Sequence, residues 1–400
     1  MRSIAFWSIC GIIFVIPWEE MAVIPGMETV AKTLGYFAIG SSFLAVAMES
    51  RIRRPPLAFL PLTLVVVWNF LSIVWSVNPD ASMSRELTYL SLLTFTWMIW
   101  EFGDSEKRIC WMFRAYLLGC CVALTTMFFS YVSGGGVGRS DELERFTGGD
   151  LNENDIATVL NIAIPFAAYL ASRASRGTRI RTAYWAFIPV AAIGVLLTGS
   201  RMGVLVLGGG LLLTAVGVLA RGLKLMIPLV IVIGVGLWLV PRFISEQLIS
   251  RVAEGTESHT YQQRIQYWQA GWSYWTKHPL EGAGVGTYKD VVVLEGLPRA
   301  KVAHNSYVTI LVEEGIVGAM LMLIFWFLLL RSIWKVPVRE RLLWFTISGI
   351  WAVSSMAITW DGNKSTWLIY GAAMVFCALP KPNSVPILRA PVRRRQPGYC

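Results

Sequence analysis

Charged residues are scarce in this sequence. Asp, Glu, Lys and Arg make up only 15% of its 400 residues, whereas soluble domains carry about 25%. Hydrophobic residues make up 55%, and the mean hydropathy is +0.56. A soluble chain of this composition could not cover its surface with polar groups. The shortage of charge therefore excludes a cytosolic enzyme, a disordered chain and a secreted disulfide scaffold, and it predicts a polytopic membrane protein.

Metal-ligand patterns are missing as well. The chain has three His and six Cys residues, and none of them shows the Cys/His spacing of a metal site. No Asp-x-Asp pair lies in a segment that we expect to face outside. We therefore expect no metal and no other cofactor. The net charge of +10 is interpreted first as membrane topology, and we expect no nucleic-acid partner.

Long apolar runs, by contrast, are abundant. About 20 apolar residues in a helix cross a bilayer, and a helix satisfies its own backbone there whereas an open sheet edge cannot. The sequence contains twelve such runs, which predict an all-α membrane protein of about twelve transmembrane helices. They are residues 4–17, 31–48, 57–75, 87–100, 110–131, 156–171, 183–197, 202–219, 225–240, 306–330, 342–359 and 366–379.

The distribution of Lys and Arg predicts the orientation of these spans. Short cytoplasmic segments are rich in Lys and Arg. If the N-terminus is cytoplasmic, most basic residues of the connecting segments fall inside, loop by loop. An even number of spans then places both termini in the cytoplasm. The short outer segments hold only Lys32, Arg85, Arg139, Arg145, Arg201 and Lys364.

The spans divide the chain into four parts. Residues 1–240 carry the first nine spans, 241–305 form an extramembrane loop domain, 306–380 carry the last three spans, and 381–400 form a basic cytosolic tail. The large loop domain therefore separates spans nine and ten on the outer side of the membrane.

An aromatic row marks a helix within this loop domain. Ile265, Trp268, Trp272 and Trp275 recur at helical spacing, which predicts a helix that lies either on the membrane surface or against the bundle. Pro279 and the glycines behind it predict its end.

Four polar residues stand at the predicted outer face. Arg201 lies in a short turn between two apolar runs, where a charge is costly and marks a candidate for function. Arg264 begins the aromatic helix, and a solvated surface Arg is its alternative interpretation. His304 lies where the loop re-enters the membrane, and an imidazole there can act as a general base. Asp361, in the last outer turn, could cap a helix or orient a His or Arg.

These residues make a coherent chemical set. Guanidinium groups bind phosphate oxygens in pairs and stay charged. A nearby His can take a proton from an attacking hydroxyl. The set suits displacement at a sugar carbon that bears a diphosphate, because that leaving group needs charge neutralisation.

A glycine run raises the alternative of a nucleotide loop. Gly282, Gly284 and Gly286 alternate with Ala283 and Val285. The run follows a helix and lacks the strand–turn–helix setting of a phosphate loop. We therefore expect a tight turn that allows close backbone packing.

At this point the motifs resemble the O-antigen ligase and polymerase superfamily of bacterial membrane glycosyltransferases. The best-matching part runs from Asp150 to about Ile324. The residues that carry the resemblance are the Thr-Gly-Ser-Arg turn ending at Arg201, residues 264–272, residues 278–288, His304-Asn305-Ser306-Tyr307, residues 313–318, and residues 145–154.

This resemblance implies a fold, a location and a reaction. It implies a large periplasmic loop between spans nine and ten of a bacterial inner-membrane protein, with the active site facing the periplasm. It implies an undecaprenyl-diphosphate-linked glycan as donor and a metal-independent, inverting transfer. Carried over, His304 is the general base, and Arg201 and Arg264 bind the diphosphate. The supporting residues are Asp361, Asn305 and Arg145.

The acceptor is less constrained by the resemblance. Polymerases of the superfamily often carry two sizeable basic periplasmic loops, whereas here one loop is long, which favours a ligase acting on lipid A–core oligosaccharide. The alternatives are an O-antigen or exopolysaccharide polymerase and a protein O-oligosaccharyltransferase. A secondary transporter is a more distant alternative, because its binding residues would lie near the bilayer midplane.

Overall fold

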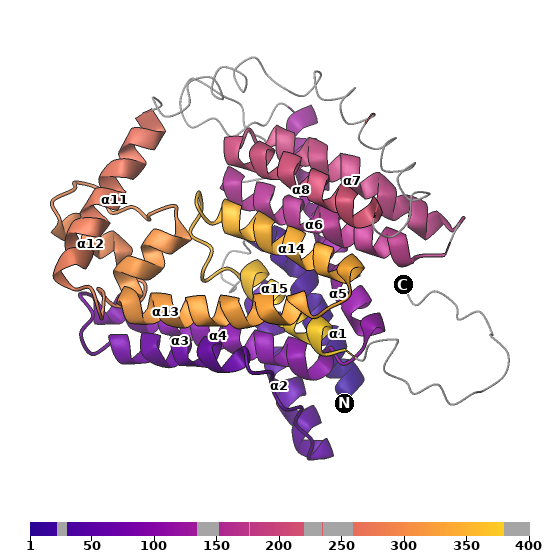
Figure 1. Ribbon diagram of the computed structural model, residues 1–400, viewed down its shortest axis with the longest axis horizontal. Helices are drawn as coiled ribbons and strands as arrows, with labels where there is room; N and C mark the ends of the chain where they lie inside the picture. The colour runs from indigo at the N-terminus through magenta and orange to yellow at the C-terminus, as the bar shows by residue number, and fades with distance from the viewer. Residues whose placement is uncertain (22–29, 134–151, 176, 220–233, 235–258, 380–400) are drawn as a thin grey trace.

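The protein is helical throughout its described parts. The computed structural model describes residues 1–21, 30–133, 152–175, 177–219, 234 and 259–379. Every regular element in these ranges is a helix and none is a strand (Figure 1), which confirms the predicted all-α class. The elements are α1 (Arg2–Val15), the 3-10 helix η1 (Ile16–Met21), α2 (Val30–Glu49), α3 (Phe59–Ser72), α4 (Pro79–Phe102), α5 (Glu106–Val132), α6 (Glu153–Arg173), α7 (Arg179–Leu197), α8 (Arg201–Leu219), α11 (His259–Lys277), α12 (Tyr288–Leu294), α13 (Ser306–Trp334), α14 (Val338–Ser354) and α15 (Lys364–Ala378).

The predicted spans, apart from the ninth, coincide with these helices. The ninth, residues 225–240, and the tail, 381–400, fall outside the described residues. α3, α4, α14 and α15 are shorter or more polar than a free-standing span, so the count of twelve stays a prediction. Within the described part, seven helices are long and apolar enough to cross a membrane: Arg2–Glu19, Val30–Glu49, Glu106–Val132, Glu153–Arg173, Arg179–Leu197, Arg201–Leu219 and Ser306–Trp334.

One boundary differs from the sequence prediction in a way that matters for the site. We predicted the fourth span from residue 87, but α4 begins at Pro79. The side chain of Asn78 accepts a hydrogen bond from the backbone N–H of Ala81, and Pro79 occupies the first turn. Both features start a helix. Arg85 therefore lies within α4 and not in an outer loop.

Two helices form the centre of the bundle. All residues of α6 from Ile156 to Ala171 are buried, and so are those of α15 from Ser365 to Phe376. α6 packs against α7, α8 and α14, and α15 packs against α4. Small residues allow the closest approaches, since a Cβ atom on Gly203 would lie only 2.6 Å from that of Ala157. Close packing of small residues is the usual contact between membrane helices.

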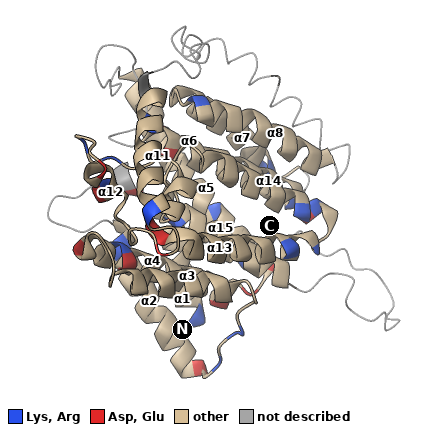
Figure 2. Ribbon diagram, turned by 60° about the vertical axis from the view of Figure 1, so that its left-hand side comes forward, with Lys and Arg blue, Asp and Glu red and all other residues tan. Residues whose placement is uncertain are grey.

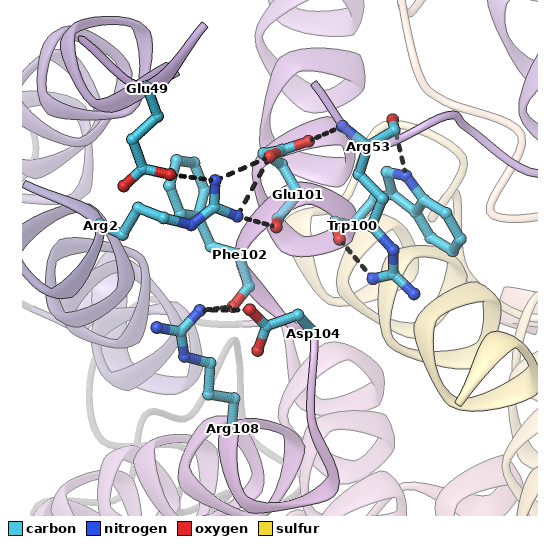
Figure 3. Close-up of polar contacts among 8 residues, drawn as sticks. All are labelled: Arg2, Glu49, Arg53, Trp100, Glu101, Phe102, Asp104 and Arg108. Atoms are coloured by element: carbon cyan, nitrogen blue, oxygen red, sulfur yellow. Dashed lines mark hydrogen bonds and ion pairs between the residues drawn. The ribbon is translucent and has the colours of Figure 1, made fainter. Parts of the chain in front are cut away.

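A polar cluster closes one end of the bundle (Figure 3). The carboxylate of Glu101, at the end of α4, is buried. Arg2 Nη1 and Nη2 each donate to Glu101 Oε1 over 3.1 Å, and the backbone N–H of Arg53 donates to Oε2 over 2.7 Å. Arg2 also pairs with the more exposed Glu49 at 3.3 Å. The cluster ties the start of the chain and the α2–α3 connection to α4.

The cluster yields a stability prediction. Replacing Glu101 by Ala leaves a guanidinium and a backbone amide without their buried acceptor, which costs about 2–3 kcal/mol. We expect a clearly lower unfolding temperature in detergent. The control is Glu49→Ala, which breaks an exposed ion pair worth less than about 1 kcal/mol. Equal stability of the two variants would contradict the structural role of Glu101.

The second polar region lies at the opposite end of α4. With a rise of 1.5 Å per residue, Arg85 and Glu101 are separated by about 24 Å along the helix axis. Figure 2 shows Lys, Arg, Asp and Glu mostly near helix ends and in connections. Figure 1 shows α11 and α12 on the left of the view, beside the left-hand ends of α3, α4 and α13. The candidate site is built where these elements meet.

Candidate active site

The glycine run is a packing device. Gly282, Gly284 and Gly286 have φ angles of 70°, 96° and 81°, a backbone region that favours glycine. A Cβ on each would come within 2.6–2.7 Å of Glu313, Ser76 and Arg85, respectively. The predicted tight turn with close backbone approach is therefore confirmed.

A break in α13 receives this loop. Gly315 has φ 66° and ψ −169°, which interrupts the helix. The carbonyls of Val312 and Glu313 then accept hydrogen bonds from the N–H groups of Ala283 and Gly284, both at 2.9 Å. The residues 278–288 and 313–318 that carry the family resemblance thus form one interlocked unit.

The carboxylate of Glu313 completes the unit. It is buried and accepts hydrogen bonds from the backbone N–H groups of Gly286 at 2.7 Å and Tyr288 at 2.9 Å. A carboxylate that accepts backbone donors at the start of a helix stabilises that helix start. Glu313 therefore fixes the entry into α12 beside the site.

The loop is also bound to α4. Ser82 Oγ donates to the carbonyl of Val285 at 2.7 Å, and Asn78 Nδ2 donates to Asp290 Oδ1 at 2.9 Å. Since α4 comes from the first quarter of the chain, these contacts join the early helices to the loop domain.

The turn at Arg201 is held against the start of α6. Ser200 Oγ donates to Asn154 Oδ1 at 2.5 Å and accepts from the backbone N–H of Gly203 at 2.9 Å. Asn161 Nδ2 donates to the carbonyl of Gly203 at 3.0 Å. Arg201, the first residue of α8, is thereby held beside the start of α6.

Electrostatic coupling shows that three of the predicted site residues lie close together. Burial lowers the pKa of Arg264, the nearby carboxylate of Glu153 opposes this, and the positive charge of Arg201 lowers it further. Burial and the charge of Arg264 lower the pKa of His304 to about 4, while Glu153 acts in the opposite direction. Arg264 therefore lies near Arg201, His304 and Glu153, and the sequence analysis did not identify Glu153.

The backbone around His304 is unusual. His304 has a φ of 47°, a left-handed conformation that is uncommon for residues other than glycine and that concentrates at functional sites. The side chain of Asn305 accepts hydrogen bonds from the N–H groups of Tyr307 and Val308 at 3.0 and 3.2 Å and so caps α13. Asn305 fixes the helix start directly after His304.

Asp361 orients an arginine, one of the two alternatives that the sequence left open. The cap of α15 is Asn363, whose side chain accepts from Ser365 N–H at 2.8 Å. Asp361 is buried, and its Oδ2 accepts from Arg85 Nη2 at 3.1 Å and from the hydroxyl of Tyr89. Arg85 was not predicted as a site residue. It lies among other polar residues of the first half of α4, such as Ser84 and Glu86, so the sequence does not set it apart.

A cavity of about 520 Å³ opens beside His304. α4, the start of α6, the start of α12, α13 and the turn after α14 surround it. Arg201 and Arg264 are not among its lining residues, whereas His304 is. Its charged and titratable lining residues are Arg85, Asp155, Tyr288, Lys289, His304 and Glu313.

The aromatic row of α11 is mainly packed. Trp268 Nε1 donates to the carbonyl of Ala303 at 2.8 Å, and Trp268 and Trp275 pack against a buried cluster that includes Tyr288. Trp272 is 57% exposed. The alternative in which this helix packs against the rest of the protein holds for Trp268 and Trp275, and α11 ends at Lys277, as predicted.

The structure does not test two further predictions, the supporting role of Arg145 and the metal independence of the reaction. Arg145 lies outside the described residues, and its supporting role stays a prediction. In the described part of the chain, no three His, Cys, Asp or Glu side chains are grouped so that they could hold a metal ion. Metal independence of the reaction also stays a prediction.

Comparison with known proteins defines the class. Residues 186–323 match the family model described as O-antigen ligase. The apolar helices and this domain together indicate a multi-pass bacterial membrane protein of a glycosyltransferase-like class. This match over residues 186–323 supports the resemblance to the O-antigen ligase superfamily that the motifs predicted. No curated protein matches the chain.

The limits of the match are informative. It covers about a third of the chain and contains Arg201, Arg264, His304 and Glu313. It ends at residue 323, next to the predicted end at Ile324, but begins at 186 and not at Asp150. The start of α6 and all of α4 therefore contribute to the site from outside the matched stretch.

Proposed function

We propose that the protein is an O-antigen ligase of the bacterial inner membrane. It transfers a glycan from undecaprenyl diphosphate to lipid A–core oligosaccharide on the periplasmic side, with both termini in the cytoplasm. The observation that carries the proposal is the convergence of Arg201, Arg264 and His304 from α8, α11 and the start of α13. All three lie in the stretch that matches the O-antigen ligase family model.

The arginine pair supports a diphosphate ligand. The two partly buried guanidinium groups lie near one carboxylate, that of Glu153, so the three charges together are net positive and favour an anionic ligand. The lowered pKa of Arg264 reflects burial and the charge of Arg201. A diphosphate has several oxygens that the two planar guanidinium groups can bind. Its negative charge grows as the sugar–oxygen bond breaks, so these arginines stabilise the leaving group.

His304 supports a general-base step. Its pKa of about 4 keeps the imidazole neutral at pH 7, so that it can accept a proton. Binding of the diphosphate neutralises Arg264 and thereby raises the pKa of His304, while the larger lowering by burial stays. As the acceptor oxygen attacks the anomeric carbon, its proton moves to His304 and the carbon–oxygen bond to the diphosphate breaks. The diphosphate leaves with the bonding electron pair, and the anomeric configuration is inverted.

A reconstitution tests this proposal. Purified protein in liposomes is given undecaprenyl-diphosphate-linked glycan with and without lipid A–core, and the products are separated on a gel. The proposal predicts a slower-migrating lipid A–core band that requires both substrates. A ladder on the polyprenyl carrier without lipid A–core would instead indicate a polymerase. A donor that stays intact under all conditions would contradict the proposed transfer.

A further inference from the structure

One face of α4 lines the cavity beside His304. Ala81, Ser84, Arg85 and Thr88 are its lining residues on this helix, at spacings of three, four and seven residues. These are the spacings of a single helix face. The face lies outside the matched stretch 186–323, so the family resemblance gives it no role.

Arg85 is fixed in place before any ligand binds. Its guanidinium donates to Asp361 Oδ2, the Tyr89 hydroxyl donates to the same carboxylate oxygen, and the Arg85 side chain remains 31% exposed. Glycines leave room for it on two sides, because a Cβ on Gly286 or Gly362 would lie 2.7 or 2.5 Å from its atoms. A donor that is already immobilised loses little entropy on binding a ligand.

The remaining lining suits a sugar. Ser84, Thr88, Asn152, Thr309 and Thr359 offer hydroxyl and amide groups. The Oγ1 atom of Thr359 is buried and, within the described ranges, has no hydrogen-bond partner. A volume of about 520 Å³ lies within the usual range of small-ligand sites. The hydroxyls of Thr88 and Thr309 donate to helix carbonyls and can still accept a hydrogen bond from a sugar hydroxyl, which a polyprenyl or acyl chain does not offer.

The position of His304 relates the cavity to the arginine pair. His304 lines the cavity and is also coupled to Arg264, whereas Arg201 and Arg264 do not line the cavity. If the diphosphate lies at the arginines, the hydroxyl that gives its proton to His304 has to come from the cavity.

We infer that this cavity binds the terminal sugar of the acceptor and that Arg85 donates hydrogen bonds to its hydroxyl groups. Asp361 and Tyr89 are positioning residues that hold Arg85. This inference rests on the proposed function, because it takes the donor diphosphate to lie at Arg201 and Arg264.

The main test narrows the cavity and leaves Arg85 and Asp361 unsubstituted. Ser84 is exposed and lines the cavity, so that Ser84→Trp fills space there while α4 keeps its packing. The matched control is Met83→Trp, because Met83 is 46% exposed and does not line the cavity. We expect Ser84→Trp to raise the KM for the acceptor ~10-fold or more, as for loss of a shaped sugar contact, with the donor KM unchanged. Met83→Trp leaves both values unchanged.

A second variant addresses Arg85 itself. Arg85→Gln is expected to raise the acceptor KM and to leave the donor KM unchanged. Arg85→Lys is expected to raise the acceptor KM less than Arg85→Gln does. A higher donor KM in Ser84→Trp, or an unchanged acceptor KM in both Ser84→Trp and Arg85→Gln, would overturn the inference.

Direct binding separates this inference from the proposed function. Calorimetry with core oligosaccharide, and separately with the free repeat-unit oligosaccharide, measures acceptor binding in the absence of any donor. Binding of either sugar that Ser84→Trp abolishes supports the inference even if no transfer is detected. Binding that persists undiminished in Ser84→Trp contradicts it even if wild-type protein transfers glycan. The sugar that binds identifies the acceptor as lipid A–core or as another lipid-linked repeat unit.

Discussion

Replacing His304 by Ala is expected to abolish glycan transfer while donor binding is retained. His304 lines the cavity, and its imidazole lies near the charge of Arg264. Loss of a positioned general base typically lowers the rate ~10²–10⁴-fold. The measurement is the initial rate of lipid A–core modification, together with retention of labelled donor on the purified protein.

A second histidine provides the control for this variant. His278 is 44% exposed, and its Nδ1 lies 3.1 Å from Glu281 Oε1 at the surface. His278→Ala is expected to transfer glycan at the wild-type rate. Near-normal transfer by His304→Ala would show that His304 is not the general base. Loss of donor binding in that variant would instead show that His304 contributes to the donor site.

Replacing Arg264 by Lys is expected to weaken donor binding although the positive charge is kept. A lysine offers a point charge, whereas the guanidinium binds two phosphate oxygens at once. Because Arg264 is partly buried beside Arg201, water does not replace the hydrogen bond to phosphate that the guanidinium makes and the lysine lacks. We expect the donor KM to rise about 10- to 100-fold, corresponding to one or two charge-assisted hydrogen bonds.

The control for this substitution is Arg299→Lys. Arg299 is exposed in the segment after α12, and its replacement should leave the donor KM unchanged. Wild-type kinetics of Arg264→Lys would mean that Arg264 is a solvated surface residue, the alternative that its sequence position also allowed.

Much of the architecture could be predicted from local patterns. Apolar runs of membrane length predict helices because the backbone must satisfy its own hydrogen bonds in lipid. The aromatic row with Pro279 behind it predicted α11 and its end at Lys277. Arg201 and His304 were found because polar residues next to apolar runs are costly and therefore informative.

The rest of the site depends on contacts between distant segments. Asp361 and Arg85 form an ion pair across 276 positions of the chain, and no local pattern connects them. Glu153, at the start of α6, lies near Arg264 and His304, which are more than a hundred positions away in the chain. The role of Glu313 follows from the break at Gly315, which turns two backbone carbonyls toward the glycine run.

The most direct test of the shared site is the pKa of His304 itself. The chain has only three His residues, so the imidazole signals of isotope-labelled protein in micelles can be assigned by comparison with His304→Ala. The account predicts a pKa near 4 in the free protein and an upward shift when undecaprenyl diphosphate is added, because the anion neutralises Arg264. A pKa near the ordinary value of about 6.5 that does not move on addition of undecaprenyl diphosphate would contradict it.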